Sequence, residues 1–159
     1  MHRLRTRVFL GLLAAGISIG VAAAEAPDFA KIVADRQATM GGFAKKVRLI
    51  KSFADGEDNG PAALEAAQAI LETAQRLPTL FPAGTSLAEL PGIKTHAKPE
   101  IWADNERFRA TAARLASQSE ALVAAIGRGD RAGTATELGA VGRVGCGACH
   151  EVFRAPLDN

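Results

Sequence analysis

Several residue types are scarce in this 159-residue sequence, and each scarcity argues against a class of protein. Two cysteines and three histidines are a poor supply for a structural zinc site, which usually needs four such ligands. The chain has no tyrosine and few β-branched runs but many alanines, so helices are favoured over sheets. We find no βαβ pattern, internal repeat, low-complexity tract or block of like charge.

The N-terminus has the pattern of a secretory signal. Three arginines precede residue 8, Val8–Val21 is an almost unbroken run of apolar and small residues, and Ala22–Ala24 fits the A-x-A cleavage rule. The run is well short of the ~20 residues that span a bilayer, which disfavours a retained membrane anchor. The sequence therefore predicts a signal peptide over residues 1–24 and one domain over residues 25–159, with no stable membrane insertion after cleavage.

The small basic excess of the full chain, 19 Lys and Arg against 17 Asp and Glu, comes from this leader. Without residues 1–24 the balance is 16 against 17. A nearly neutral mature chain gives no basis for nucleic-acid binding. Its length of 135 residues is typical of one domain.

The motif that carries the chemistry is Cys146-Gly147-Ala148-Cys149-His150, close to the C-terminus. C-x-x-C-H is the attachment sequence of c-type haem, in which two thiols add to the porphyrin vinyl groups and the imidazole binds the iron. On a helix, spacings of three and four residues place these three side chains on nearly the same face. A disulfide between positions i and i+3 of a helix is geometrically awkward, so haem attachment is the preferred interpretation.

The export signal and the haem motif support each other. Covalent haem attachment in bacteria occurs outside the cytoplasm, where a free C-x-x-C pair is liable to oxidise. The two features together predict a location in the bacterial periplasm.

Apolar periodicity predicts four helices, over about residues 28–53, 61–77, 99–126 and 131–153. A segment of about twenty residues, 78–98, interrupted by proline and glycine, joins the second helix to the third, and the other links are short. This pattern predicts an all-α, antiparallel up-down-up-down four-helix bundle with one long crossover. The fourth helix is rich in glycine, which indicates close approach of its backbone to a flat cofactor or to a neighbouring helix.

A second axial ligand to the iron has to come from upstream, because no methionine lies among the nine residues after His150. Once the leader is removed, Met40 is the only methionine, and it lies on the apolar face of the first predicted helix. A thioether opposite histidine gives a low-spin, electron-transferring iron. The alternative is that Met40 fills a gap in the core beside the porphyrin, and periodicity alone favours that alternative.

Two further polar residues have two interpretations each. Arg36 interrupts the apolar stripe one turn before Met40, where it could pair with a haem propionate or lie on a solvated helix edge. His96 lies in the predicted crossover and is expected to be an exposed loop residue. Its alternative role is that of an axial ligand in place of Met40.

The C-terminal C-x-x-C-H followed by Glu151-Val152-Phe153-Arg154, together with Arg36-Gln37-Ala38-Thr39-Met40 on the first helix, resembles the cytochrome c′ family over essentially the whole mature chain. The segments Leu77–Pro82 and Pro99–Trp102 are more similar to its low-spin branch, the c-556 type.

This resemblance implies one haem c bound covalently through Cys146 and Cys149, with His150 as proximal and Met40 as distal ligand of the iron. It also implies that Arg36 lies near the propionates and that Arg154 is the basic residue one turn after the haem histidine. Some high-spin members of the family carry a methionine at the position of Met40 that does not bind the iron. Members of the family often form homodimers.

Two functions are compatible with these features, and neither is enzymatic. The first is a periplasmic one-electron carrier with low-spin iron ligated by histidine and methionine, which exchanges electrons with other periplasmic redox proteins. The alternative is a five-coordinate, high-spin cytochrome c′ that binds nitric oxide or carbon monoxide. A haem enzyme is disfavoured because distal acid–base catalysis needs a group such as histidine over the iron.

Overall fold

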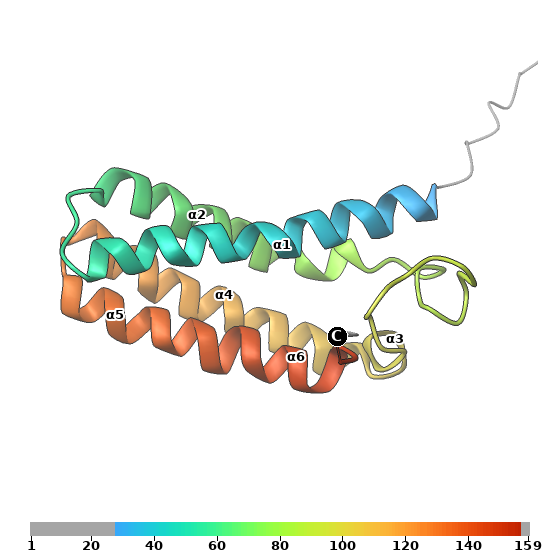
Figure 1. The fold of residues 1–159 in the computed structure, drawn as a ribbon. Helices are drawn as coiled ribbons and strands as arrows, with labels where there is room; N and C mark the ends of the chain where they lie inside the picture. The colour runs from blue at the N-terminus through green and yellow to red at the C-terminus, as the bar shows by residue number, and fades with distance from the viewer. Residues whose placement is uncertain (1–27, 157–159) are drawn as a thin grey trace, which may run out of the picture.

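The fold is an antiparallel helical bundle, given by a computed structural model that describes residues 28–156. Figure 1 shows α1 and α2 side by side above a second layer formed by α4 and by the continuous arm of α5 and α6. Successive arms run in opposite directions, which confirms the predicted four-helix bundle. The elements are α1 (Phe29–Ala54), α2 (Gly60–Arg76), the 3₁₀ turn η1 (Leu77–Leu80), α3 (Glu100–Ala103), α4 (Asn105–Gly127), α5 (Arg131–Ala140), the π-helical segment η2 (Val141–Gly147) and α6 (Ala148–Phe153).

Local signals in the sequence fix several helix ends. The carboxylate of Asp28 accepts a hydrogen bond from the backbone N–H of Lys31 at 3.0 Å, and Asp130 accepts one from Gly133 at 2.8 Å. Both are N-caps that satisfy amides left free in a first helical turn. Gly56, with φ 117°, lets the chain turn between α1 and α2 in a conformation that other residues rarely adopt.

The third arm differs from the predicted single helix over residues 99–126, because it is broken at Asp104 into α3 and α4. Asp104 has φ −119° and ψ 56°, outside the helical region, and its carboxylate accepts a hydrogen bond from the backbone N–H of Arg107 at 3.4 Å. An aspartate that caps the next helix favours the break.

The fourth arm runs in one direction as predicted, but its middle is a π-helix rather than an α-helix. Three glycines lie in this segment, and glycine lowers the preference for a regular α-helix. A Cβ at Gly145 would lie 2.5 Å from Cδ1 of Leu115, so a larger residue here would force that side chain of α4 to move. The close approach to a neighbouring helix that the glycines indicate is therefore confirmed at this position.

Small side chains let the two layers of the bundle pack closely. α2 and α4 form the most extensive contact between helices, and four alanines of α2 are buried, namely Ala63, Ala66, Ala67 and Ala74. Helices whose contacts are small residues approach one another closely. The larger core side chains include Ile50, Ile70, Phe108 and Leu122.

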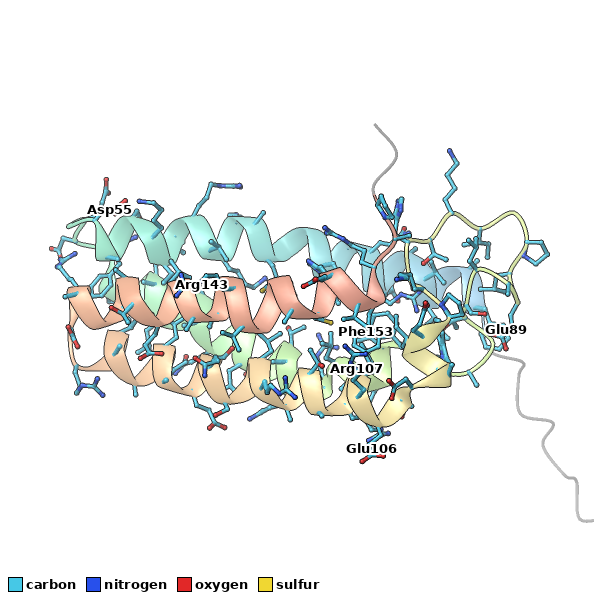
Figure 2. The ribbon with its side chains drawn as sticks, turned by 90° about the horizontal axis from the view of Figure 1, so that it is seen from below. Asp55, Glu89, Glu106, Arg107, Arg143 and Phe153 are labelled. Carbon is cyan, nitrogen blue, oxygen red and sulfur yellow. The ribbon has the colours of Figure 1, made fainter. Side chains whose placement is uncertain are left out.

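The bundle has two different ends. Figure 2 shows Asp55, in the α1–α2 loop, at one end, and Glu89 at the other, in the long segment over residues 81–99 that we call the crossover. The described residues contain no β-strand, but an isolated antiparallel bridge joins Ala97 in the crossover to Arg154 after α6.

No helix within residues 28–156 is both long enough and apolar enough to cross a membrane. The predicted signal peptide, residues 1–24, lies outside the described residues.

Candidate haem site

The two cysteines lie at the junction between η2 and α6. Cys146 is in the last turn of the π segment and Cys149 is in the first turn of α6, so the predicted single α-helical face is replaced here by a junction of two helix types. Both thiols are free and half-buried. Burial raises the pKa of Cys146, and burial together with the charge of Cys146 raises the pKa of Cys149 to about 11. Both side chains are therefore neutral thiols at neutral pH.

His150 is half-buried beside an open hollow of about 640 Å³. Glu151, Arg154 and Lys98 also line this hollow. Burial and, to a smaller extent, the charge of Arg154 lower the pKa of His150, which favours the neutral imidazole. Within residues 28–156 its ring nitrogens have no hydrogen-bonding partner. A neutral imidazole without a protein partner is chemically suited to bind a metal ion.

Met40 lies on α1, which packs on α5 of the arm that carries the two cysteines. Its side chain is half-buried, like those of Phe43 and Val47 one and two turns further along the helix. All three pack against the buried core cluster that Cys146 and Cys149 also contact. The structure thus brings the sequence-predicted methionine and the two cysteines to the same apolar core.

Arg36 is buried, with 3% of its surface exposed. Its guanidinium donates hydrogen bonds to Oγ1 of Thr85 at 3.2 Å, to the carbonyl oxygen of Thr85 at 3.3 Å and to Oγ1 of Thr95 at 3.1 Å. It also lies 4.5 Å from the centre of the Phe81 ring, a cation–π arrangement. Arg36 is therefore not on a solvated helix edge, which excludes one of the two interpretations of the sequence.

The charge of Arg36 has no carboxylate partner among the described residues. Burial accordingly lowers the pKa of its guanidinium. A guanidinium has five N–H donors, so the three bonds to the crossover leave donors for a further acceptor.

Arg154 follows α6 directly and its side chain is exposed. Its backbone N–H donates to the carbonyl oxygen of His150 at 3.2 Å, and its backbone pairs with Ala97. This arrangement places the guanidinium at the rim of the hollow beside His150.

His96 is only partly exposed, because the end of the crossover pairs with the chain after α6. Its carbonyl oxygen accepts a hydrogen bond from Ala155 at 2.8 Å, and its Nδ1 lies 3.1 Å from the carbonyl oxygen of Pro156. The expected exposed loop histidine is in fact part of a paired segment.

Four residues of this region were not predicted as part of a site: Phe81, Thr85, Thr95 and Trp102. Phe81 stacks edge to face on Phe108 and Trp102, and the indole N–H of Trp102 donates to the carbonyl oxygen of Phe81 at 3.1 Å. Apolar periodicity does not identify Thr85 and Thr95, because the crossover has no regular repeat, and its length is the only signal for them. Phe81 and Trp102 lie in the two segments that resemble the c-556 type.

The donor set fits covalent haem. Two unbridged, half-buried thiols at positions i and i+3 and an adjacent imidazole without a protein partner are the groups that haem c requires. The apolar core beside the thiols suits the porphyrin, and the buried guanidinium of Arg36 and the exposed one of Arg154 are cationic groups that suit its propionates.

Comparisons with known proteins agree with this chemistry. The model of the family described as Cytochrome C′ matches residues 31–154. The chain is 39% identical over 89 residues to a cytochrome c′ of Pararhodospirillum photometricum (55% of this chain, 66% of the relative). It is 37% identical over 81 residues to a cytochrome c-556 of Agrobacterium tumefaciens strain B2A (51% and 60%). The matched regions thus span less than two thirds of either relative.

The fold comparison covers more of the chain. A solved cytochrome c′, described as having an unusual ligand-controlled dimer dissociation, superimposes with a TM-score of 0.74 at 26% identity, covering 83% of this chain and 100% of that one. Cytochromes c′ bind haem c covalently through cysteine, and Cys146 and Cys149 are the two cysteines here. Because the family model spans nearly all the described residues, the chain belongs to the cytochrome c′ family.

Proposed function

We propose that this c-type cytochrome is a periplasmic one-electron carrier whose haem iron is ligated by His150 and Met40. The observation that carries the proposal is that Met40, the only methionine of the described residues, packs against the same apolar core as the two haem cysteines. Haem c supplies an iron that changes oxidation state by one electron. With His150 and Met40 both bound to the iron, the haem would supply electron exchange with other proteins rather than an enzymatic reaction.

The remaining residues have supporting roles in this proposal. Cys146 and Cys149 hold the porphyrin on one helical arm, so that His150 is presented to the iron from the same arm. Arg36 and Arg154 balance the propionate charges, Arg36 through the donors that the crossover leaves free. The apolar side chains of Phe43 and Val47 exclude water from the Met40 side of the haem.

A high-spin cytochrome c′ that binds nitric oxide or carbon monoxide is the second candidate. It is supported by the cytochrome c′ relative, whose identity of 39% is similar to the 37% of the c-556 relative. It is also supported by the apolar surroundings of Met40, since an apolar distal face without a ligand would admit a diatomic gas.

The optical spectrum of the reduced protein tests the ligation. We expect a sharp low-spin spectrum in the wild type and a broad high-spin spectrum in Met40→Ala, which should also bind carbon monoxide at least about tenfold more tightly. Met40→Leu is the matched control for packing, because it keeps the apolar volume and removes the sulfur. A low-spin spectrum retained in Met40→Leu, or a high-spin wild type, would contradict the proposal.

Export and assembly belong to the same proposal. Cleavage of the signal peptide over residues 1–24 predicts Glu25 as the N-terminus of protein recovered from the periplasmic fraction. The likeness to a cytochrome c′ known for dimer dissociation supports a homodimer, which sedimentation of the haem-loaded protein measures.

A further inference from the structure

The crossover is attached at both ends to the arms that carry the proposed iron ligands. On the α1 side, Arg36 binds Thr85 and Thr95, and Gln37 donates from its side-chain amide to the carbonyl oxygen of Lys94 at 2.7 Å. Phe29 also packs closely under Gly84, where a Cβ would lie 2.8 Å from Cζ of the phenylalanine.

On the α6 side, the crossover pairs with the chain just after the helix. The backbone N–H of Lys98 donates to the carbonyl oxygen of Phe153 at 3.0 Å, and the N–H of Ala155 donates to the carbonyl oxygen of His96 at 2.8 Å. Figure 2 shows Phe153, the last residue of α6, at the same end of the bundle as Glu89 of the crossover.

Thr95 links these two attachments. Its Oγ1 accepts one hydrogen bond from Arg36 and a second from the backbone N–H of Ala97 at 3.2 Å. Arg36 lies one turn before Met40, and Phe153 lies one turn after His150. The crossover therefore connects positions that are one turn away from each proposed ligand.

Direct packing joins the two ligand arms at α5, away from the iron ligands, and does little to set their spacing at α6. α1 packs mainly on α2 and α5, whereas α6 packs on η2, α4 and α3. Between residues 28 and 156 no comparable contact joins α1 to α6. Met40 on α1 and Cys149 on α6 are both only half-buried.

We propose that Arg36, Thr85 and Thr95 form a crossover clamp that holds α1 at the distance from α6 at which Met40 binds the iron. The three are positioning residues, because they act through Met40 and need not touch the iron. This inference rests on the proposed ligation by Met40. The buried position of Arg36 supports it, since a guanidinium removed from water is retained only where acceptors meet its donors, and the crossover supplies three such hydrogen bonds.

The test uses threonine variants, because a change at Arg36 would also alter its proposed propionate contact. Thr95→Val removes the shared acceptor at nearly constant shape, and Thr85→Val removes the second hydroxyl. Thr73→Val is the matched control, because Thr73 is also buried but donates only to the carbonyl oxygen of Ala69 within α2. Each haem-loaded variant is measured for its spin state and for the affinity of the reduced protein for carbon monoxide, which competes with Met40.

A second measurement detects the clamp without using the haem chemistry. Amide hydrogen exchange should become about tenfold faster at residues 94–98 and 153–155 in Thr95→Val, and should stay unchanged in Thr73→Val.

We expect Thr95→Val to bind carbon monoxide at least about tenfold more tightly than the wild type, and the double variant more tightly still. A purely structural role would lower stability and leave this affinity unchanged. If the wild type is low-spin and Thr95→Val binds carbon monoxide like Thr73→Val, the inference alone is overturned. A high-spin wild type would overturn the proposed ligation, and the inference with it.

Discussion

Each end of the bundle is held by an arginine that lies over a phenylalanine ring, but the two arginines meet different partners. At the α1–α2 loop, Arg131 lies 4.5 Å from the ring centre of Phe53 and donates to the carbonyl oxygens of Phe53 and Glu57. At the crossover, Arg36 lies 4.5 Å from the ring centre of Phe81 and binds two threonines.

The two arginines differ in their exposure and in the charges that surround them. Arg131 is partly exposed and faces the C-terminal end of α1, where the helix dipole attracts a cation. Among the described residues Arg36 is buried and meets neutral partners, which stabilise its charge through hydrogen bonds and through the Phe81 ring. The same type of side chain thus closes one end of the bundle locally, and at the other end joins a long crossover to the helix that carries Met40.

The largest effect is expected from Arg36→Ala. The substitution leaves the carbonyl oxygen of Thr85 without its charged donor and opens a space in a buried region, so we expect a loss of about 2–3 kcal/mol in the free energy of unfolding. Urea unfolding of the haem-loaded protein measures this loss. The reduced spectrum should shift toward high spin at the same time. Wild-type stability in this variant would show that the buried guanidinium contributes no net stabilisation.

A smaller effect is expected from Arg131→Ala. It removes two hydrogen bonds to carbonyl groups and one cation–π contact at a partly exposed site, which together contribute about 1–2 kcal/mol. Because Arg131 lies at the end of the bundle away from the crossover, the reduced spectrum should not change. A shift toward high spin in Arg131→Ala would erase the distinction between the two arginines.

The smallest effect concerns the hydrogen bonds between Ser86 and Glu89 within the crossover. Hydrogen bonds from the side chain and the backbone N–H of Ser86 lower the pKa of Glu89 below its ordinary value of 4.5. The ionised carboxylate therefore stabilises the fold above that value, and the contribution is lost as the pH falls through the lower folded-state pKa. Glu89→Gln should lower the urea midpoint slightly at neutral pH.

Urea unfolding at acid pH provides the check. Below the folded-state pKa of Glu89, the wild type and Glu89→Gln should unfold at the same urea concentration. Glu72→Gln, at an exposed position of α2, is the control. An equal difference between wild type and Glu89→Gln at acid and neutral pH would mean that the carboxylate charge is not involved.

Periodicity and capping residues predicted most of the fold, and the errors lie where local preference and packing disagree. The boundaries of α1 and α2 agree with the prediction to within a residue or so, because their apolar positions recur regularly and Asp28 and Gly60-Pro61 mark their starts. The break at Asp104 and the π segment around Gly145 were missed. The first depends on a cap inside an apolar pattern, and the second on a contact with Leu115 of another helix.

The sequence by itself determined the haem chemistry of this protein, because C-x-x-C-H supplies both thiols and the imidazole within five consecutive residues, and no distant contact is needed to bring them together. Only the tertiary structure decided what Arg36 does. Its partners lie 49 and 59 residues away in a crossover without periodicity, so their contact depends on the path of the folded chain. A helical repeat determines which face of a helix a residue occupies, whereas the packed chain determines what that face meets.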